Sequence, residues 1–542
     1  MIAALRHALD AAFGDLARQM RWSFLPPLMV YFAAGISGLT SVVGAFFVKD
    51  YLDLSAAFLA GLTFWAGLPW VMKLPLGHLV DLAWRRKAAF VWAGAGLIAL
   101  SLLIMYALIA HTAEMRAVAP VEAWYVAAAL LAPTGYVVQD VVADAMTVEA
   151  VPRADAQGRP LPDDVQKALH TTMQTLGRFA IIGGLALVAA VNIFMFTGVE
   201  DLPEGGRAEV YARIYLLALA IPVVSILGVT LAAVMRRRRA ARMRRAGADE
   251  ARIAELLETP EEPTSPNWEI LGGGFAFAAV SLAVGLADPP FAQEIVFAVT
   301  LPVILFLIRR LLRELPPDKA RALIGTAIVI FVFRAVPLPG PGQTWFEIDV
   351  LGFDERFLSI LSLITGVLTL AGLVILRPLM ATRSIADIIV ILTLASAVLA
   401  LPNIGLYYGV QDWTARWTGG VVDARFIAVL DTAVESPLGQ VAMVPMLAWI
   451  ARNAPPTLKA TFFAVMASFT NLALSAASLA TKYVNQIFTV TREVTDRATG
   501  EVTVPADYSE LGLLLIAVAA AGVALPLLTV WAVQRSRFRT GE

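Results

Sequence analysis

The sequence contains no cysteine and only four histidines among its 542 residues. The absence of cysteine excludes disulfides, thiolate metal sites and cysteine nucleophiles. The histidines show no spacing typical of metal ligands, and the sequence has no phosphate-binding loop and no evident nucleophile–base pair. Gly272–Gly274 lies inside an apolar segment, where small residues serve helix packing. We therefore expect neither an enzyme nor a resident cofactor.

Charged residues are also scarce, at 16% of the chain, whereas hydrophobic residues make up 58%. Soluble proteins average about 25% charged residues, so this composition indicates an integral membrane protein. We expect no cleavable signal peptide, because the first 22 residues carry five charged side chains between Arg6 and Arg21. Leu5, Leu9 and Phe13 recur at helical spacing there, which predicts an amphipathic helix on the membrane surface.

Long apolar runs dominate the rest of the chain. A helix needs about 20 apolar residues to cross the hydrocarbon layer. We count fourteen such segments, near 25–48, 57–80, 88–110, 124–147, 169–196, 211–235, 270–287, 291–308, 322–336, 357–376, 385–401, 425–450, 460–484 and 511–533. They predict an all-α polytopic membrane protein.

The order of these segments predicts the domain organisation. We expect an amphipathic cytoplasmic helix (1–24), a six-helix bundle (25–235), a cytoplasmic linker (236–267), two extra helices with a basic loop (268–319), a second six-helix bundle (320–534) and a cytoplasmic tail (535–542). Lys and Arg concentrate in alternate loops, such as Arg85–Lys87 and Arg236–Arg239. By the positive-inside rule this places both termini in the cytoplasm, and we expect a bacterial inner (plasma) membrane.

A few charged residues lie inside the apolar segments, where they are costly and mark ligand or ion pathways. Asp140 and Asp144 are four residues apart and so share one helix face. Asp431 and Glu435 repeat this spacing in the corresponding later helix. The cations are Lys73, Arg178 and Arg334. We predict that these seven residues line a substrate- and proton-binding cavity. The alternative is a set of buried ion pairs that hold the helices in register.

The matched acidic pairs are typical of transporters built from duplicated halves, whose substrate lies near the midplane between them. The two extra helices carry no ionisable residue in their apolar cores, so we expect them to be peripheral. At the cytoplasmic end of the second helix, Gly77, Asp81, Arg85 and Arg86 resemble the loop motif of the major facilitator superfamily that latches the inward gate.

Several stretches resemble the folate–biopterin transporter family of that superfamily. They are Phe46–Asp50, Leu68–Gly77, Gln139–Glu149, Met443–Leu447 and Phe463–Asn471. The resemblance implies a major facilitator fold that alternates access and carries folates or pterins, driven by protons. A carboxylate can accept hydrogen bonds from a pterin's amino group and ring N–H, and Arg or Lys can bind folate carboxylates. Trp65, Trp70 and Phe179 are candidates for ring stacking.

The sequence is also compatible with two other functions. The first is a proton-coupled permease for muropeptides, which are sugar–peptide ligands that need hydroxyl and amide partners. The second is a non-transporting assembly or pigment-delivery factor of the same fold, in which the membrane charges would be dispensable. We expect a monomer whose partners are a small-molecule substrate, protons and lipid, with no nucleic acid.

Overall fold

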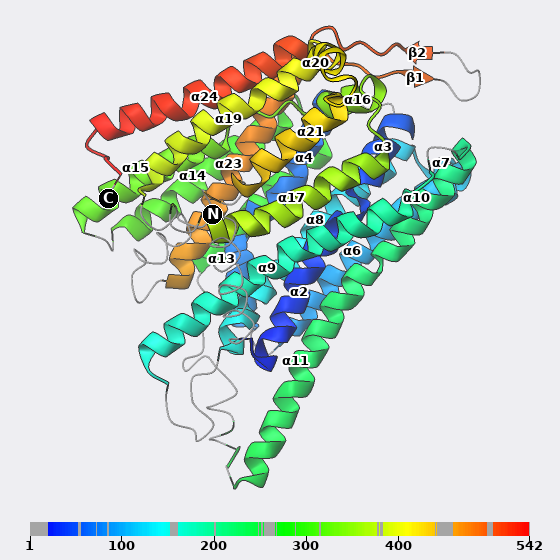
Figure 1. The fold of residues 1–542 in the computed structure, drawn as a ribbon. Coiled ribbons are helices and arrows are strands. Elements are labelled where there is room, and N and C mark those ends of the chain that lie inside the picture. The colour runs from blue at the N-terminus through cyan, green and yellow to red at the C-terminus, as the bar shows by residue number, and fades with distance from the viewer. Residues whose placement is uncertain are drawn as a thin grey trace.

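The computed structural model describes residues 20–51, 56–71, 73–83, 86–151, 161–199, 202–247, 249–250, 268–287, 289–313, 316–376, 383–438, 459–495 and 502–540, with the single residues 253, 266, 379 and 441. Within them the chain is almost entirely helical (Figure 1). Long helices run side by side through the body of the molecule. One short two-stranded hairpin, Val494–Thr495 (β1) with Val502–Val504 (β2), projects at one end.

The N-terminal helices are η1 (Trp22–Phe24), α2 (Leu25–Gly35), η2 (Ile36–Thr40), α3 (Ser41–Tyr51), α4 (Ala56–Val71), α5 (Lys73–Leu82), α6 (Lys87–Ala110), α7 (Thr112–Val118), α8 (Val121–Ala150), α9 (Asp163–Met195), α10 (Glu204–Ala218) and α11 (Ala220–Arg245). The middle pair is α13 (Trp268–Ala287) and α14 (Ala292–Leu312). The C-terminal helices are α15 (Pro317–Arg334), α16 (Pro341–Asp349), α17 (Glu355–Ile375), α19 (Ile385–Tyr407), α20 (Val410–Thr418), α21 (Ala424–Glu435), η4 (Ser436–Leu438), α23 (Lys459–Ile487) and α24 (Leu511–Arg535).

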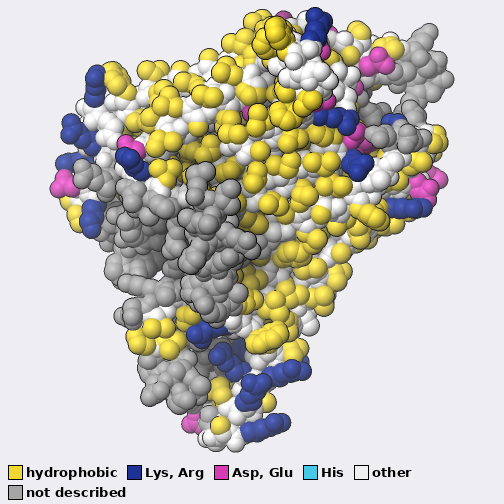
Figure 2. Space-filling view, in the orientation of Figure 1, with side chains coloured by type: hydrophobic (Ala, Val, Ile, Leu, Met, Phe, Trp, Pro, Cys, Tyr) yellow, Lys and Arg dark blue, Asp and Glu magenta, His cyan; other side chains and the backbone are white. Residues whose placement is uncertain are grey.

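Eight helical stretches of the described chain are long and apolar enough to cross a membrane: 22–47, 87–110, 121–147, 176–195, 205–245, 355–373, 385–407 and 511–535. Three shorter apolar helices lie at 58–71, 271–285 and 292–306. Hydrophobic side chains cover much of the face shown in Figure 2, while Lys and Arg gather toward its edges and at the far end of α11. The chain is thus a multi-pass membrane protein, and the count of fourteen spans stays a prediction.

The second expected span carries two prolines close to Lys73. Helix α4 runs to Val71 and α5 from Lys73, and residue 72 lies outside the described residues. Pro69 lies inside α4, and Pro75 follows Lys73 by two residues in α5. Proline lacks the N–H of a helical hydrogen bond, so each of these positions removes one hydrogen bond from the helix near Lys73.

Glycines set the closest helix contacts among the N-terminal helices. Gly94 of α6 lies directly against the backbone of Gly135 of α8, and any side chain at either position would collide with the opposite helix. Gly35 of α2 contacts the backbone of Ile181 of α9 in the same way. Small residues at helix crossings allow this approach, which maximises van der Waals contact in a membrane.

Two helix pairs make the most extensive contacts between the N-terminal and C-terminal helices. They are α4 with α23 and α9 with α17. The Asn471 side chain donates from Nδ2 to the Trp70 carbonyl at 3.1 Å across the first pair. Gly366 of α17 packs on the backbone of Ala186 of α9 across the second. These contacts form the seam along which the two sets of helices meet.

Helices α13 and α14 pack on each other and contact both sides of this seam. Gly274 of α13 lies against the ring of Pro75 in α5. On α14, Glu294 pairs with Lys482 of α23 at 3.2 Å and accepts a hydrogen bond from Tyr483. None of the residues lining the cavity described below comes from α13 or α14.

Candidate functional site

Lys73, Asp140 and Asp144 form an ion cluster between α5 and α8. Lys73 Nζ lies 2.7 Å from Asp140 Oδ2 and 2.7 Å from Asp144 Oδ2. The hydroxyl of Tyr31 in α2 donates to Asp144 Oδ1 at 2.6 Å. The two aspartates lie one turn apart on α8, so a single ammonium can bridge them. Three helices are therefore joined at one point.

The cluster is partly shielded from solvent, and its charges balance. The Lys73 and Asp140 side chains are 20% and 16% exposed, whereas Asp144 is 46% exposed. Arg178 of α9 interacts electrostatically with both Asp140 and Tyr31. Two carboxylates thus face two cations, which satisfies the requirement that charges in low dielectric be compensated.

Tyr31 is a member of this cluster that sequence reasoning missed. It lies in an apolar run, where a tyrosine is most often packing or an interface anchor. Its ring packs against Gly177, so that any side chain at that position would collide with it. Gly177 directly precedes Arg178 in the chain, and this contact brings the Tyr31 hydroxyl beside the ion cluster.

Gln139 fixes the rotation of α8 next to Asp140. Its side chain is only 3% exposed. Its Nε2 donates to the Val91 carbonyl of α6 at 3.2 Å, and its Oε1 accepts from Ser225 of α11 at 2.9 Å. A buried amide with both ends satisfied is costly to displace. The face of α8 that carries Asp140 is therefore held toward α5.

A second polar cluster lies between α16, α19 and α21, and it is acidic. Asp431 Oδ2 accepts from Asn403 at 3.0 Å, while the Asp431 Oδ1 atom is buried with no hydrogen-bond partner among the described residues. Gln343 donates to Glu347 at 2.8 Å and to Asn403 at 3.4 Å. Asp431 interacts electrostatically with Glu347 and Glu435. Within the described chain no Lys or Arg forms an ion pair with these carboxylates.

Glu347 was not among the residues predicted from the sequence, because it lies in the short helix α16 and not in an apolar segment. Burial raises the pKa of Glu347, and the nearby Asp431 carboxylate raises it further. The hydrogen bond from Gln343 acts in the opposite direction. This carboxyl is therefore easier to protonate than an exposed glutamate.

The remaining predicted charges lie apart from these partners. Arg334 is the last residue of α15, and its buried Nε has no hydrogen-bond partner in the described part of the chain. No ion pair joins it to Asp431 or Glu435 within that part. In the loop motif, Gly77 packs near Val141 of α8 and Arg86 is exposed. Arg85 and the side chain of Asp81 lie outside the described residues.

The aromatic candidates occupy different surroundings. Trp65 packs edge-on against Phe64, with ring centroids 5.6 Å apart, and touches Gly285 of α13. Trp70 accepts the Asn471 hydrogen bond through its backbone carbonyl. Phe179 is partly buried and follows Arg178 in α9. Their role in ring stacking stays a prediction.

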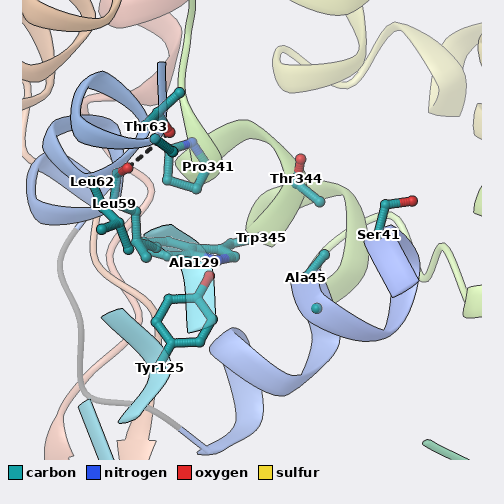
Figure 3. Close-up of a pocket in the computed structure, with 12 residues that line it drawn as sticks. Ser41, Ala45, Leu59, Leu62, Thr63, Tyr125, Ala129, Pro341, Thr344 and Trp345 are labelled. Atoms are coloured by element: carbon teal, nitrogen blue, oxygen red, sulfur yellow. Dashed lines mark hydrogen bonds between the residues drawn. The ribbon is translucent and has the colours of Figure 1, made fainter. Parts of the chain in front are cut away.

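A cavity of about 380 Å³ lies at the seam, between α3, α4 and α8 on one side and α16 on the other. Figure 3 shows its walls. They are formed by Ser41, Gly44, Ala45, Leu59, Leu62, Thr63, Ala66, Tyr125, Ala129, Pro341, Thr344 and Trp345. The described residues that line this cavity include none of those predicted from the sequence as site residues.

Solved transporter structures share this fold over nearly the whole chain. A POT family transporter in complex with 5-aminolevulinic acid superposes with a TM-score of 0.59 at 13% identity, covering 94% of this chain and 95% of that one. The peptide transporter POT in complex with alafosfalin gives a TM-score of 0.57 at 16% identity, covering 96% and 98%. The chain thus shares its fold with these solved transporters.

The sequence comparisons find similarity to one transporter family. Residues 295–537 match the model of the BT1 family. A folate-biopterin transporter from Synechocystis sp. is 23% identical over 456 residues, which cover 83% of this chain and 72% of that protein. The resemblance to the folate–biopterin transporter family is confirmed, and the relatives are transporters, not enzymes.

Proposed function

We propose that this protein is a secondary active transporter of folate- or pterin-like organic anions, coupled to protons and working by alternating access. The observation that carries the proposal is Lys73, whose ammonium lies 2.7 Å from two carboxylates at once. The name of the relative from Synechocystis supports the substrate class.

The ion cluster can link ligand binding to proton binding. An anionic ligand needs a cation, and Lys73 and Arg178 are the cations that face Asp140 in the described chain. When the ligand takes one of them, a carboxylate loses its compensating charge. Burial then favours protonation of that carboxylate. Because each event promotes the other, the affinities for ligand and proton become mutually dependent.

The acidic cluster supplies a second place where a proton can bind. Asp431, Glu435 and Glu347 interact with amides and with one another, without an ion pair in the described residues. Neighbouring carboxylates repel, so the group is stabilised by taking up a proton. We propose that Asp140 and Asp431 lie on opposite sides of one transport pathway, each able to exchange a proton.

We propose fourteen membrane-spanning helices, arranged as two six-helix bundles with α13 and α14 between them in sequence, and both termini in the cytoplasm. The bacterial inner membrane is the proposed location. The seam pairs α4–α23 and α9–α17 would then be the contacts that rearrange as access alternates.

The substrate class is tested by uptake into proteoliposomes that contain the purified protein. Radiolabelled folate should accumulate, and unlabelled pterin should compete with it. A muropeptide added at the same concentration should not compete. Uptake of folate no greater than in protein-free liposomes, or competition by the muropeptide alone, would reject the proposed substrate class.

A further inference from the structure

The cavity at the seam has the chemistry of a site for an uncharged, flat ring. Its volume of about 380 Å³ lies within the range of small-molecule sites, roughly 300–1,000 Å³. Among the described residues, its walls carry two large aromatic side chains, Tyr125 and Trp345, and no Lys, Arg, Asp or Glu. Aromatic side chains bind flat rings through stacking and edge-on contacts. In Figure 3 the Tyr125 hydroxyl points toward Trp345.

Hydroxyl groups supply the polar part of the cavity. The Ser41 hydroxyl donates to the Gly38 carbonyl at 2.7 Å, and the Thr63 hydroxyl donates to the Leu59 carbonyl at 3.0 Å. A hydroxyl that donates its hydrogen to the backbone still has lone pairs that accept. Ser41 and Thr63 therefore present acceptors, which match the N–H and amino groups at the edge of a heteroaromatic ring.

Trp345 is held in place before any ligand arrives. Its side chain is only 3% exposed. The guanidinium of Arg492 lies 5.8 Å from the centroid of its ring, a cation–π contact. Gly342, three residues earlier on α16, packs tightly against Val490. A wall that is already ordered loses little entropy when it binds a ligand.

The cavity and the ion cluster lie on the same face of α8 but far apart. From Tyr125 to Asp140 is fifteen residues, or about 22 Å of helix at 1.5 Å per residue. Each residue rotates the helix by about 100°, so Tyr125 and Asp140 lie at angles about 60° apart around the helix axis. Both residues are therefore on one side of α8. A single ring cannot contact both places.

We propose that this cavity is a subsite for the aromatic heterocycle of the transported ligand, separate from the ion cluster, which binds anionic groups. The inference rests on the proposed function for the identity of the ring, a pterin. Its location at the seam couples the subsite to transport, because α16 forms one wall and α3, α4 and α8 form the others. Movement of the two sets of helices against each other would open the subsite and release the ring.

Binding to the purified protein with fragment ligands tests the subsite. The probes are 6-methylpterin, which has the ring without the anionic tail, p-aminobenzoylglutamate, which has the tail without the pterin, and adenine, an unrelated neutral heterocycle. Loss of a stacking partner weakens binding of a flat base by about tenfold or more. We expect Trp345→Ala to weaken 6-methylpterin binding by that factor and to leave p-aminobenzoylglutamate binding unchanged.

Two further variants separate lost stacking from a damaged fold. Trp345→Phe keeps an aromatic face and should retain most of the 6-methylpterin affinity. Trp413→Ala removes an exposed tryptophan from α20, 62% exposed and away from the cavity, and should bind every probe like the wild type. Equal 6-methylpterin affinity in Trp345→Ala and Trp413→Ala would overturn the subsite. A misfolded Trp345→Ala would instead lose both fragments, and Trp345→Phe then decides the question.

The fragment-binding experiment gives one result if the subsite is wrong and a different result if the proposed substrate is wrong. If the wild type binds 6-methylpterin and Trp345→Ala binds it equally well, the subsite is wrong and the substrate class stands. If the wild type binds adenine through Trp345 but no pterin, the subsite stands and the proposed substrate is wrong. If it binds neither heterocycle, the cavity is not a heterocycle site.

Discussion

The hydroxyl of Tyr211 in α10 donates a hydrogen bond to the carboxylate of Glu355, the first residue of α17. Their side chains are 1% and 5% exposed. The bond joins the N-terminal and C-terminal helices close to the end where α16 and the β-hairpin lie (Figure 1). Nearby, Leu358 of α17 packs on the apolar core of the N-terminal helices. This end of the seam is therefore closed by a buried polar contact as well as by apolar packing.

Removal of the Tyr211 hydroxyl should loosen this end of the seam. In Tyr211→Phe the buried Glu355 carboxylate loses its donor, at a cost of about 1–3 kcal/mol. We expect a lower Tm in detergent and faster labelling of a cysteine placed at Ser359 of α17. Tyr508→Phe is the matched control, because Tyr508 also donates to a carboxylate, that of Asp349, in an exposed setting. A Tm for Tyr211→Phe equal to that of the control would show that the buried bond contributes nothing to closure.

Lys73 should matter more for stability than either aspartate does. Lys73→Met leaves two like charges one turn apart without their bridging cation, and breaking a buried pair costs about 3–5 kcal/mol. Asp144 is 46% exposed, so the loss should fall at the low end of that range. The double variant Lys73→Met, Asp144→Asn leaves Asp140 facing Arg178, so the charges still balance, and it should recover most of the Tm lost in Lys73→Met.

The double variant also separates stability from transport. It should fold but fail to take up folate, because no cation remains on α5 to attract the anion. Folate uptake at the wild-type rate by this variant would show that the ion cluster is structural only.

Protonation of Glu347 should make the stability of the protein depend on pH. Its folded-state pKa is raised by burial and by Asp431, so folding favours the protonated form. Its contribution to stability is then fully present below the unfolded pKa and is lost as pH rises through the raised folded value. Glu347→Gln should flatten the decline of Tm with rising pH.

The control for that titration is Glu209→Gln. Glu209 is 65% exposed and pairs with Arg213 on the surface, where such pairs are worth little. Its variant should keep the wild-type pH profile. The carboxylates that face Glu347 are those of Asp431 and, beyond it, Glu435. A pH profile of Glu347→Gln identical to that of the wild type would show that Glu347 does not contribute to the pH dependence.

The helical membrane fold and the transporter class could be predicted from the sequence, because long apolar runs and family motifs are local features. The sequence predicts Lys73, Asp140 and Asp144 in one cavity with four other charged residues, since carboxylates in an apolar helix require a cation, but it does not single out this ion cluster. Tyr31 and Glu347 were missed because nothing next to them in the sequence indicates their partners. Their positions depend on helix rotation, which contacts such as Gly94–Gly135 and Tyr31–Gly177 determine.

The cavity could not be predicted for the same reason. Its walls come from four separate helices, and most of its lining residues are small or apolar, as in any membrane helix. The sequence around Trp345 shows no pattern that indicates a binding site either, because α16 is a nine-residue helix between two longer ones. Arg334 is a residue that the sequence did indicate, because a charge in an apolar segment is evident. However, it forms no ion pair with Asp431 or Glu435 in the described chain.

We propose that a carboxylate of the ion cluster exchanges a proton each time the protein moves its ligand. The most direct measurement compares wild type with Asp140→Asn in proteoliposomes, under an imposed pH gradient and in folate exchange without a gradient. Asp140→Asn should exchange labelled for unlabelled folate and yet fail to accumulate it against a gradient. Glu149→Gln, which breaks the Lys87–Glu149 pair near the end of α8, should behave like the wild type. Gradient-driven accumulation by Asp140→Asn at the wild-type level would contradict the account.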